Sequence, residues 1–153
     1  MARFLYDLHA HSNASDGDFA PEHIFRRARA LRLRGIVLTD HNTTASMNVA
    51  AQLAKRYGLK TCEGLEISAK ERCADVHLLG YSRNFLKDIL DRELRKIQRG
   101  YTEKVEAQVK LIRKKKLANI TLQDVRNIRP RAQFLVKYDL VRAIHRIEQT
   151  PLS

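Results

Sequence analysis

Apolar and polar positions follow two different rhythms in the first part of the chain. Residues 3–9 alternate one by one, which predicts a strand, and residues 35–41 form a short apolar run typical of a buried parallel strand. Between them, apolar side chains recur at helical spacing from Pro21 to Leu31, and Gly35 stops the pattern. This order predicts a strand–helix–strand unit.

The same alternation continues through the next part of the chain. Residues 44–58 predict a second helix with Thr43 or Thr44 as its N-cap, and residues 59–69 and 73–82 predict two more strands. Because strands and helices alternate in this way, we expect an α/β fold with a mostly parallel sheet or barrel.

Beyond these strands the pattern becomes helical. Residues 86–112 keep an apolar spacing of three or four, which predicts one long amphipathic helix, or two helices broken near Gly100. Residues 120–127 predict a short helix capped by Thr121, and residues 133–147 predict a last helix.

Charge divides the chain into two expected parts, residues 1–83 and residues 84–153. Of the formal net charge of +12, +3 falls in the first part and +9 in the second. A basic surplus of this kind indicates an anionic partner such as nucleic acid or a phosphorylated substrate, although a solvated basic face would give the same composition.

Composition excludes several classes of protein. At 153 residues with 44% hydrophobic side chains, the chain suits one globular domain. It has no apolar run long enough to span a membrane and no secretory signal, so we expect a cytoplasmic protein. Cys62 and Cys73 form neither a metal-ligand pair nor a disulfide framework, and we expect two free, mostly buried thiols.

Histidines and acids recur where the predicted strands end. In β/α architectures functional side chains gather at the carboxyl ends of strands. His9 and His11 end the first predicted strand, Asp16 follows in the next loop, and His41 ends the second strand. Glu66 lies near the end of the third strand, and His77 lies within the fourth. Alternate strand positions share a face, so His9 and His11 can chelate one ion. Imidazoles and carboxylates together suit zinc, manganese or iron, and Glu66 can bridge two cations.

Other histidines and acids receive different interpretations. Asp7 and Asp40 are close in sequence to the candidate ligands. They either orient imidazoles by hydrogen bonds to the ring nitrogen that does not bind metal, or are plain solvated acids. His23 and His145 lie inside helical stretches, and we interpret them as ordinary structural or surface side chains.

Four motifs in order give the chain a specific resemblance: DLHAHSNASDG, LTDHNT, GLEIS and VHLLGY. Over about residues 4–82 it resembles the N-terminal half of the PHP (polymerase and histidinol phosphatase) family of metal-dependent phosphoesterases. The resemblance implies a partial, distorted β/α barrel with an appended basic helical segment, and two to three divalent metal ions. It implies that His9, His11 and Glu66 hold the first ion, that Glu66 bridges to a second held by His77, and that Asp16 and His41 help to hold a third.

The later region resembles, more loosely, an insertion in a nucleotide-phosphatase branch of the family. That branch has an arginine–proline–histidine segment, and here the sequence is NIRPRAQFLV. Arg129 matches the arginine, which implies a phosphate-binding role, while Arg131 stands where histidine is expected. The alternative is an exposed structural arginine.

The family's remaining ligands come from two C-terminal motifs, and neither is present in these 153 residues. We therefore expect a fragment, a truncated relative, or a chain whose site another chain completes. A partly built barrel leaves a sheet edge and apolar helix faces uncovered, which favours association, including a homo-oligomer.

Two main functions remain open at this point. The first is a phosphoesterase that uses a metal-activated hydroxide to hydrolyse a phosphate ester of a nucleotide or short 5′-phosphorylated oligonucleotide. The second is a non-catalytic, truncated PHP module that binds metal, nucleic acid or both. A structural PHP module within a DNA polymerase assembly is a weaker third alternative, because no polymerase sequence is present.

Overall fold

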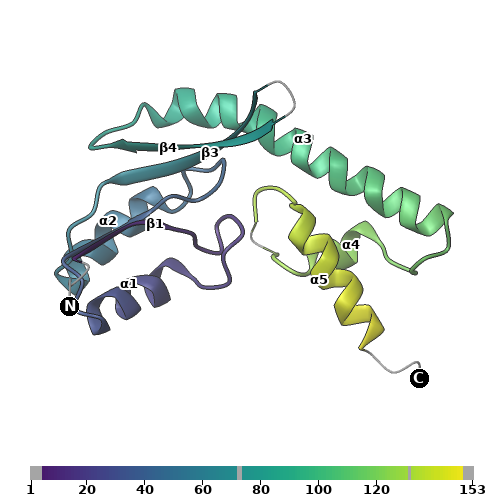
Figure 1. The fold of residues 1–153 in the computed structure, drawn as a ribbon, viewed down its shortest axis with the longest axis horizontal. Helices are drawn as coiled ribbons and strands as arrows, with labels where there is room; N and C mark the ends of the chain where they lie inside the picture. The colour runs from purple at the N-terminus through teal and green to yellow at the C-terminus, as the bar shows by residue number, and fades with distance from the viewer. Residues whose placement is uncertain (1–4, 72–73, 131, 150–153) are drawn as a thin grey trace. The chain divides into compact units, whose positions relative to one another are not determined.

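The computed structural model of this chain describes residues 5–71, 74–130 and 132–149 (Figure 1). It is an α/β protein, as predicted, and it divides into unit 1, Met1–Leu94, and unit 2, Arg95–Ser153. Its elements are β1 (Tyr6–Ala10), α1 (Pro21–Ala30), β2 (Gly35–Leu38), α2 (Met47–Tyr57), β3 (Glu63–Glu71), β4 (Ala74–Ser82), α3 (Lys87–Lys114), α4 (Leu122–Arg126) and α5 (Lys137–Glu148). The division between the units falls inside α3.

The strands of unit 1 form two pairs. β1 and β2 are parallel, whereas β3 and β4 form an antiparallel hairpin in continuous register from Glu63 opposite Ser82 to Glu71 opposite Ala74. The prediction of a mostly parallel sheet is therefore wrong for the second pair. The physical reason lies in the connection, since two residues can join antiparallel strands but a parallel crossover needs a dozen or more.

Isolated parallel bridges bring β3 alongside β2. Gly35 pairs with Lys60 before β3 begins, and His41 pairs with Glu66 after β2 has ended. Unit 1 therefore places the carboxyl ends of β1 and β2 beside the middle of β3.

The core of unit 1 lies between α1, β2 and α2. Its buried side chains are Phe25, Ala28, Ile36, Leu38, Ala50, Leu53, Ala54 and Leu59. The burial of these apolar side chains holds β2 against both helices. Each large apolar side chain that is fully removed from water contributes about 1.5–3 kcal/mol.

The start of α2 differs from the prediction. The residue at the N-cap position is Ser46, not Thr43 or Thr44. Both threonines are engaged elsewhere, because the Thr43 hydroxyl accepts from the backbone of Ala45 and the Thr44 hydroxyl donates to Asp91.

Unit 2 is helical. α3 runs through Gly100 without a break, which decides between the two alternatives for this stretch. α4 begins with the predicted cap, in which Thr121 and Asp124 form a reciprocal capping box. The buried core is Val105, Val109, Ile120, Val125, Leu135, Leu140 and Ala143. No helix among the described residues is long and apolar enough to cross a membrane.

A buried ion pair links the segment after α4 to the first turn of α5. Arg129 donates from Nε and Nη2 to the two carboxylate oxygens of Asp139, at 2.6 and 2.7 Å, and both side chains are buried. Asp139 also accepts from the backbone N–H of Val136 at 2.9 Å. This carboxylate explains why α5 begins at Lys137 rather than at residue 133, since it binds the backbone just before the helix.

We expect Asp139→Asn to destabilise the chain by about 3–5 kcal/mol, because it leaves the buried Arg129 charge without its counterion. Asp124→Asn is the matched control, and we expect it to cost about 1 kcal/mol because it weakens only an exposed cap. Chemical unfolding followed by circular dichroism measures both changes. Equal effects of the two substitutions would contradict the importance of the ion pair.

Candidate metal centre

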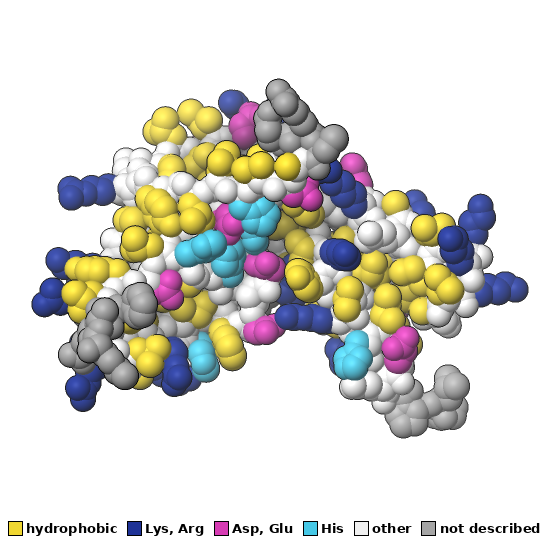
Figure 2. Space-filling model, in the orientation of Figure 1, with side chains coloured by type: hydrophobic (Ala, Val, Ile, Leu, Met, Phe, Trp, Pro, Cys, Tyr) yellow, Lys and Arg dark blue, Asp and Glu magenta, His cyan; other side chains and the backbone are white. Residues whose placement is uncertain are grey.

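Six candidate ligands lie close together in unit 1, and one of them is the buried carboxylate of Glu66. They are the six side chains selected from the sequence: His9, His11, Asp16, His41, Glu66 and His77. Figure 2 shows one group of histidine side chains close together, next to acidic side chains, with other histidines lying apart from it.

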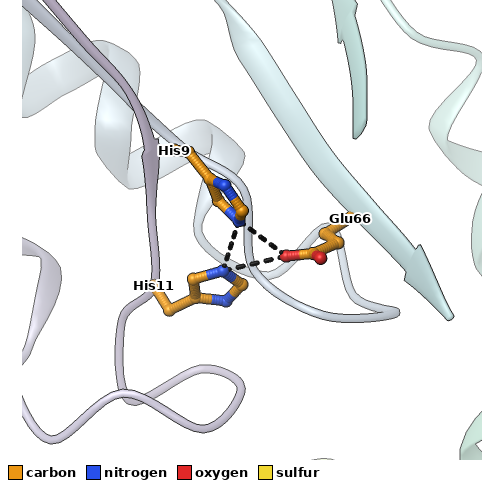
Figure 3. Close-up of side chains that lie close together, drawn as sticks. All are labelled: His9, His11 and Glu66. Atoms are coloured by element: carbon orange, nitrogen blue, oxygen red, sulfur yellow. Dashed lines mark hydrogen bonds and ion pairs between the residues drawn. The ribbon is translucent and has the colours of Figure 1, made fainter. Parts of the chain in front are cut away.

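The backbone explains why the first three ligands meet. His9 lies on β1 and His11 just beyond it, two positions apart and therefore on the same side. Figure 3 shows both rings directed toward Glu66 of β3. His9 Nε2 and His11 Nε2 each lie 2.9 Å from Glu66 Oε2 and 3.0 Å from one another.

The other ligands extend the same cluster on two sides. His77 of β4 is opposite Ser68, diagonal to Glu66 on the same face of the hairpin, and its Nδ1 lies 2.8 Å from Glu66 Oε1. His41 Nε2 lies 3.6 Å from Glu66 Oε2 and 3.8 Å from Asp16 Oδ2. Asp16 Oδ1 in turn lies 3.3 Å from His11 Nδ1.

The position of Glu66 differs from the prediction in one respect. It lies in the middle of β3 rather than near its end, because β3 continues to Glu71 as one arm of the hairpin. The bridge between His41 and Glu66 nevertheless brings this mid-strand carboxylate to the carboxyl ends of β1 and β2.

The donor set fits divalent metal ions. Three groups of ligand atoms lie within 4.8 Å of one another: His9, His11 and Glu66; His11, Asp16 and His41; His41, Glu66 and His77. In the first group the three atoms form a triangle with edges of 2.9–3.0 Å. An ion at a coordination distance of about 2.1 Å from all three atoms fits above that triangle.

The charge of the cluster follows from its contacts. Although burial opposes ionisation of Glu66, the hydrogen bond with His9 and the imidazoles of His41 and His11 hold the pKa of Glu66 below its usual value. The carboxylate therefore stays negative and favours cations beside it.

Asp16 and His11 support each other's charged forms. The hydrogen bond with the Asp16 carboxylate raises the pKa of His11, although the partial burial of the His11 ring acts in the opposite direction. His11 lowers the pKa of Asp16 to about 2. In contrast, burial lowers the pKa of His41. A neutral imidazole is the form that binds metal.

Asp7 and Asp40, for which the sequence left open an orienting role or a solvated position, form hydrogen bonds with groups other than imidazole rings, and their orienting role stays a prediction. Asp40 is fully buried and accepts hydrogen bonds from the backbone and hydroxyl of Ser12 and from the hydroxyls of Ser15 and Ser46. Asp7 accepts from the backbone N–H of His9. Asp40 therefore holds the loop that carries Asp16, because three serines need an acceptor in a water-excluded position.

Asn42 also positions the site, and it was missed in the sequence. Its side chain accepts from Ser68 N at 2.9 Å and donates to Ser68 Oγ at 3.0 Å, and its backbone N–H donates to the carbonyl of Glu66. Its φ of 50° is in the left-handed region, which asparagine tolerates better than most residues. An asparagine directly after a strand-end histidine was the available signal.

The remaining candidate residues lie outside the cluster. His23 stacks on Phe19, and His145 contacts Gln149. Arg129 belongs to unit 2, and its side chain is 7% exposed, so the alternative of an exposed arginine is wrong. Its phosphate-binding role stays a prediction, since Asp139 engages Nε and Nη2, whereas Nη1 has no hydrogen-bond partner among the described residues.

Of the two predicted thiols, Cys62 is free but only partly buried. Burial and the neighbouring Glu63 raise the pKa of Cys62, which disfavours the reactive thiolate. Cys73, and Arg131 of the arginine–proline segment, lie outside the described residues.

Comparison with known proteins identifies the family of this site. A family model described as the PHP domain matches residues 7–123. The chain belongs to the PHP family. Over 110 residues this PHP chain is 34% identical to the 5′-3′ exoribonuclease Rnm of Salmonella typhimurium, covering 71% of the chain and 36% of the relative. It is also 34% identical over 98 residues to the 3′,5′-nucleoside bisphosphate phosphatase of Chromobacterium violaceum, covering 64% of the chain and 34% of the relative.

Solved structures share the fold of the PHP chain. A metal-dependent phosphoesterase of Bifidobacterium adolescentis superposes with a TM-score of 0.81 at 23% identity, over 95% of this chain and 51% of that one. An amidohydrolase of Chromobacterium violaceum, solved with sulfate and no metal, gives 0.80 at 25% identity, over 91% and 49%. The PHP chain thus spans about a third of the curated relatives and about half of these structures.

The pairing of His11 with Asp16 generates a pH prediction for the metal-free protein. We expect Asp16→Asn to lower the pKa of His11, since it removes the carboxylate that favours the imidazolium. NMR titration of the His11 ring measures this shift. Asp75→Asn, which changes an exposed acid of the β3–β4 hairpin, is the control and should leave His11 unchanged.

The sign of the stability change follows from the same two shifts. A raised pKa of His11 stabilises the fold at low pH, and this contribution is lost as pH rises through the raised value. A lowered pKa of Asp16 stabilises the fold above its unfolded value, and this contribution is lost as pH falls toward about 2. The difference in stability between the natural chain and Asp16→Asn should therefore be greatest at mildly acidic pH, and a difference that grew toward alkaline pH would contradict the pairing.

Proposed function

We propose that this chain carries the metal-binding part of a phosphoesterase that hydrolyses a phosphate ester of a nucleotide or a short 5′-phosphorylated oligonucleotide. The observation that carries the proposal is the convergence of four imidazoles and two carboxylates, from β1, β3, β4 and the segments after β1 and β2, within one cluster. The names of the relatives, an exoribonuclease and a nucleoside bisphosphate phosphatase, support the substrate class.

The proposed cofactors are two to three divalent ions, zinc, manganese or iron. His9, His11 and Glu66 would hold one, Glu66 would share a second with His77, and Asp16 and His41 would help to hold a third, in agreement with the three groups of neighbouring atoms. When bound, such ions lower the pKa of water and neutralise charge on phosphoryl oxygens.

The chain's own residues prepare the site for this chemistry. Glu66 is 3% exposed and stays ionised, so it supplies a permanent negative charge between the imidazoles. Asn42 fixes the backbone at Glu66 and Ser68, and Asp40 fixes the loop before Asp16. Because backbone and buried hydrogen bonds hold these ligands, little reorganisation is needed when a cation or phosphate arrives.

We further propose that the two strand pairs are part of a distorted β/α barrel of the PHP type. Leu8 of β1 and Leu78 of β4 are 53% and 54% exposed, which is unusual for strand side chains of this size and suits covering by further strands. Those strands would come from more of the same protein, from a second copy, or from a complementing chain.

A non-catalytic module that binds nucleic acid is the second candidate function. The net charge of +9 over residues 84–153 supports it, because lysine and arginine neutralise phosphates whatever the sequence of the nucleic acid. This candidate predicts salt-dependent binding without turnover.

We expect His9→Ala with His11→Ala to abolish metal retention and to lower phosphoesterase activity by at least about 100-fold, since even losing a group that orients a ligand typically costs 10–100-fold. Elemental analysis of the purified chain, with assays on p-nitrophenyl phosphate, nucleotides and short 5′-phosphorylated RNA, measures both effects.

The matched control is His23→Ala with His145→Ala, which removes two histidines outside the cluster and should change neither quantity. A chelator should remove activity from the natural chain. Full activity in the His9 and His11 double variant would refute the proposed site, and metal binding without turnover in the natural chain would favour the second candidate.

A further inference from the structure

A cavity lined by basic side chains lies at the other end of the strands from the metal-ligand cluster of His9, His11, Asp16, His41, Glu66 and His77. A cavity of about 510 Å³ opens where the strands of unit 1 begin. It is lined by Tyr6 at the start of β1, Arg34 just before β2 and Lys60 before β3. Because β1 and β2 are parallel, their amino ends line this cavity and their carboxyl ends lead to the histidines. Along the chain, His9 and His11 lie roughly 10 and 16 Å beyond Tyr6, at about 3.3 Å per residue.

The lining is cationic. Four of its seven residues are Arg29, Arg32, Arg34 and Lys60, and none of the seven is acidic. None of these four cations forms an ion pair with a carboxylate within the described ranges 5–71, 74–130 and 132–149. In contrast, Arg56 on the neighbouring helix α2 pairs with Glu22 at 2.7 Å. Four unpaired cations around one cavity repel each other, and an anion in the cavity would relieve that repulsion.

The backbone holds the lining residues in place. Arg34 donates its N–H to the carbonyl of Leu5 at 2.7 Å, and Lys60 donates its N–H to the carbonyl of Arg34 at 2.8 Å. Gly35 permits this close approach, because a Cβ there would lie 2.6 Å from the Lys60 carbonyl oxygen and 2.9 Å from Tyr6 Cδ1. The backbone that carries the charged side chains of Arg34 and Lys60 is therefore held in place by hydrogen bonds between neighbouring strand ends.

Arg32 occupies a position that glycine usually takes. α1 and α2 end in the same hydrogen-bond pattern, in which the chain turns through a left-handed residue. That residue is Gly58 with φ 64° after α2, but it is Arg32 with φ 58° after α1. A left-handed conformation is unfavourable for an arginine backbone. Lys116 adopts the same conformation, with φ 55°, at the end of α3 and outside the cavity, so the position of Arg32 in the cavity lining, and not its conformation, is what links it to a ligand.

We propose that this cavity is a second binding site of the chain, which takes phosphate groups carried beside a nucleobase, either in single-stranded RNA or in a free nucleotide. The arginines and the lysine would contact phosphates, and Tyr6, which is 43% exposed, together with Leu33 would form an apolar wall for a base or ribose. A volume of about 510 Å³ suits a ligand of that size. The site is separate from the metal ligands and does not require the proposed hydrolysis.

The experiment measures binding without turnover. A fluorescent single-stranded oligoadenylate is titrated with the full chain carrying His9→Ala and His11→Ala, in chelator, so that the metal-ligand cluster does not contribute. Arg32→Gln with Arg34→Gln tests the cavity. Arg27→Gln with Lys55→Gln is the matched control, because it removes the same charge from the last turns of α1 and α2 outside the cavity.

We expect the cavity variant to bind RNA about tenfold more weakly at moderate salt. The slope of log affinity against log salt should become shallower by about 1.4, which is about 0.7 for each phosphate that is no longer neutralised. The control should change affinity by less than about twofold. Equal losses of affinity in both variants, or unchanged affinity in both, would overturn the proposal.

Two further measurements complete the test. Competition by ADP that disappears in the cavity variant would assign the site to free nucleotides, whereas failure of ADP to compete would assign it to the RNA backbone. Arg32→Gly should weaken binding without lowering the melting temperature, since glycine suits the left-handed position. A lower melting temperature with unchanged RNA affinity would show that Arg32 serves only the helix end, and would overturn its role in the site.

Discussion

The candidate site depends on the contacts between the buried carboxylate of Glu66 and four imidazoles, because a carboxylate that is removed from water needs hydrogen-bond or ionic partners. The rings of His9, His11 and His77 each bring a nitrogen to within 3 Å of Glu66, and His41 lies slightly farther away. Burial alone would favour the neutral acid, but these contacts keep Glu66 ionised. The same arrangement that makes the buried charge tolerable also creates a surplus of nitrogen and oxygen donors around one point, which is what a divalent cation requires.

A second buried carboxylate, that of Asp40, holds the segments next to the cluster. Asp40 uses both of its oxygens to hold the hydroxyls of Ser12, Ser15 and Ser46. These serines belong to the loop after β1 and the segment before α2, so one side chain ties together the two connections that carry the candidate ligands Asp16 and His41. The positions of these candidate ligands therefore depend on Asp40, because its hydrogen bonds hold the backbone segments that carry them.

Unit 1 thus has two chemically different ends. The carboxyl ends of β1 and β2 lead to imidazoles and carboxylates, which suit cations, and their amino ends lead to arginines and a lysine, which suit anions. The ligand that we propose for both ends is a phosphorylated one, which metal ions would bind at one end and cationic side chains at the other. The PHP family model extends from residue 7 to residue 123, so it covers the six candidate ligands and every residue that lines the cavity except Tyr6.

The sequence alone determined the α/β class, the PHP family and the six candidate ligands, because strand periodicity and motif spacing are local properties that survive without a three-dimensional context. It also determined the cap of α4, in which Thr121 and Asp124 are three residues apart. The antiparallel pairing of β3 and β4, the mid-strand position of Glu66, the serine contacts of Asp40 and the burial of Arg129 were decided by tertiary structure. Each of these depends on which distant segments approach one another: Asp40 meets Ser12 across 28 positions and His9 meets Glu66 across 57. Such contacts are set by the packing of helices and strands around a common core, and the local pattern of residues does not specify them.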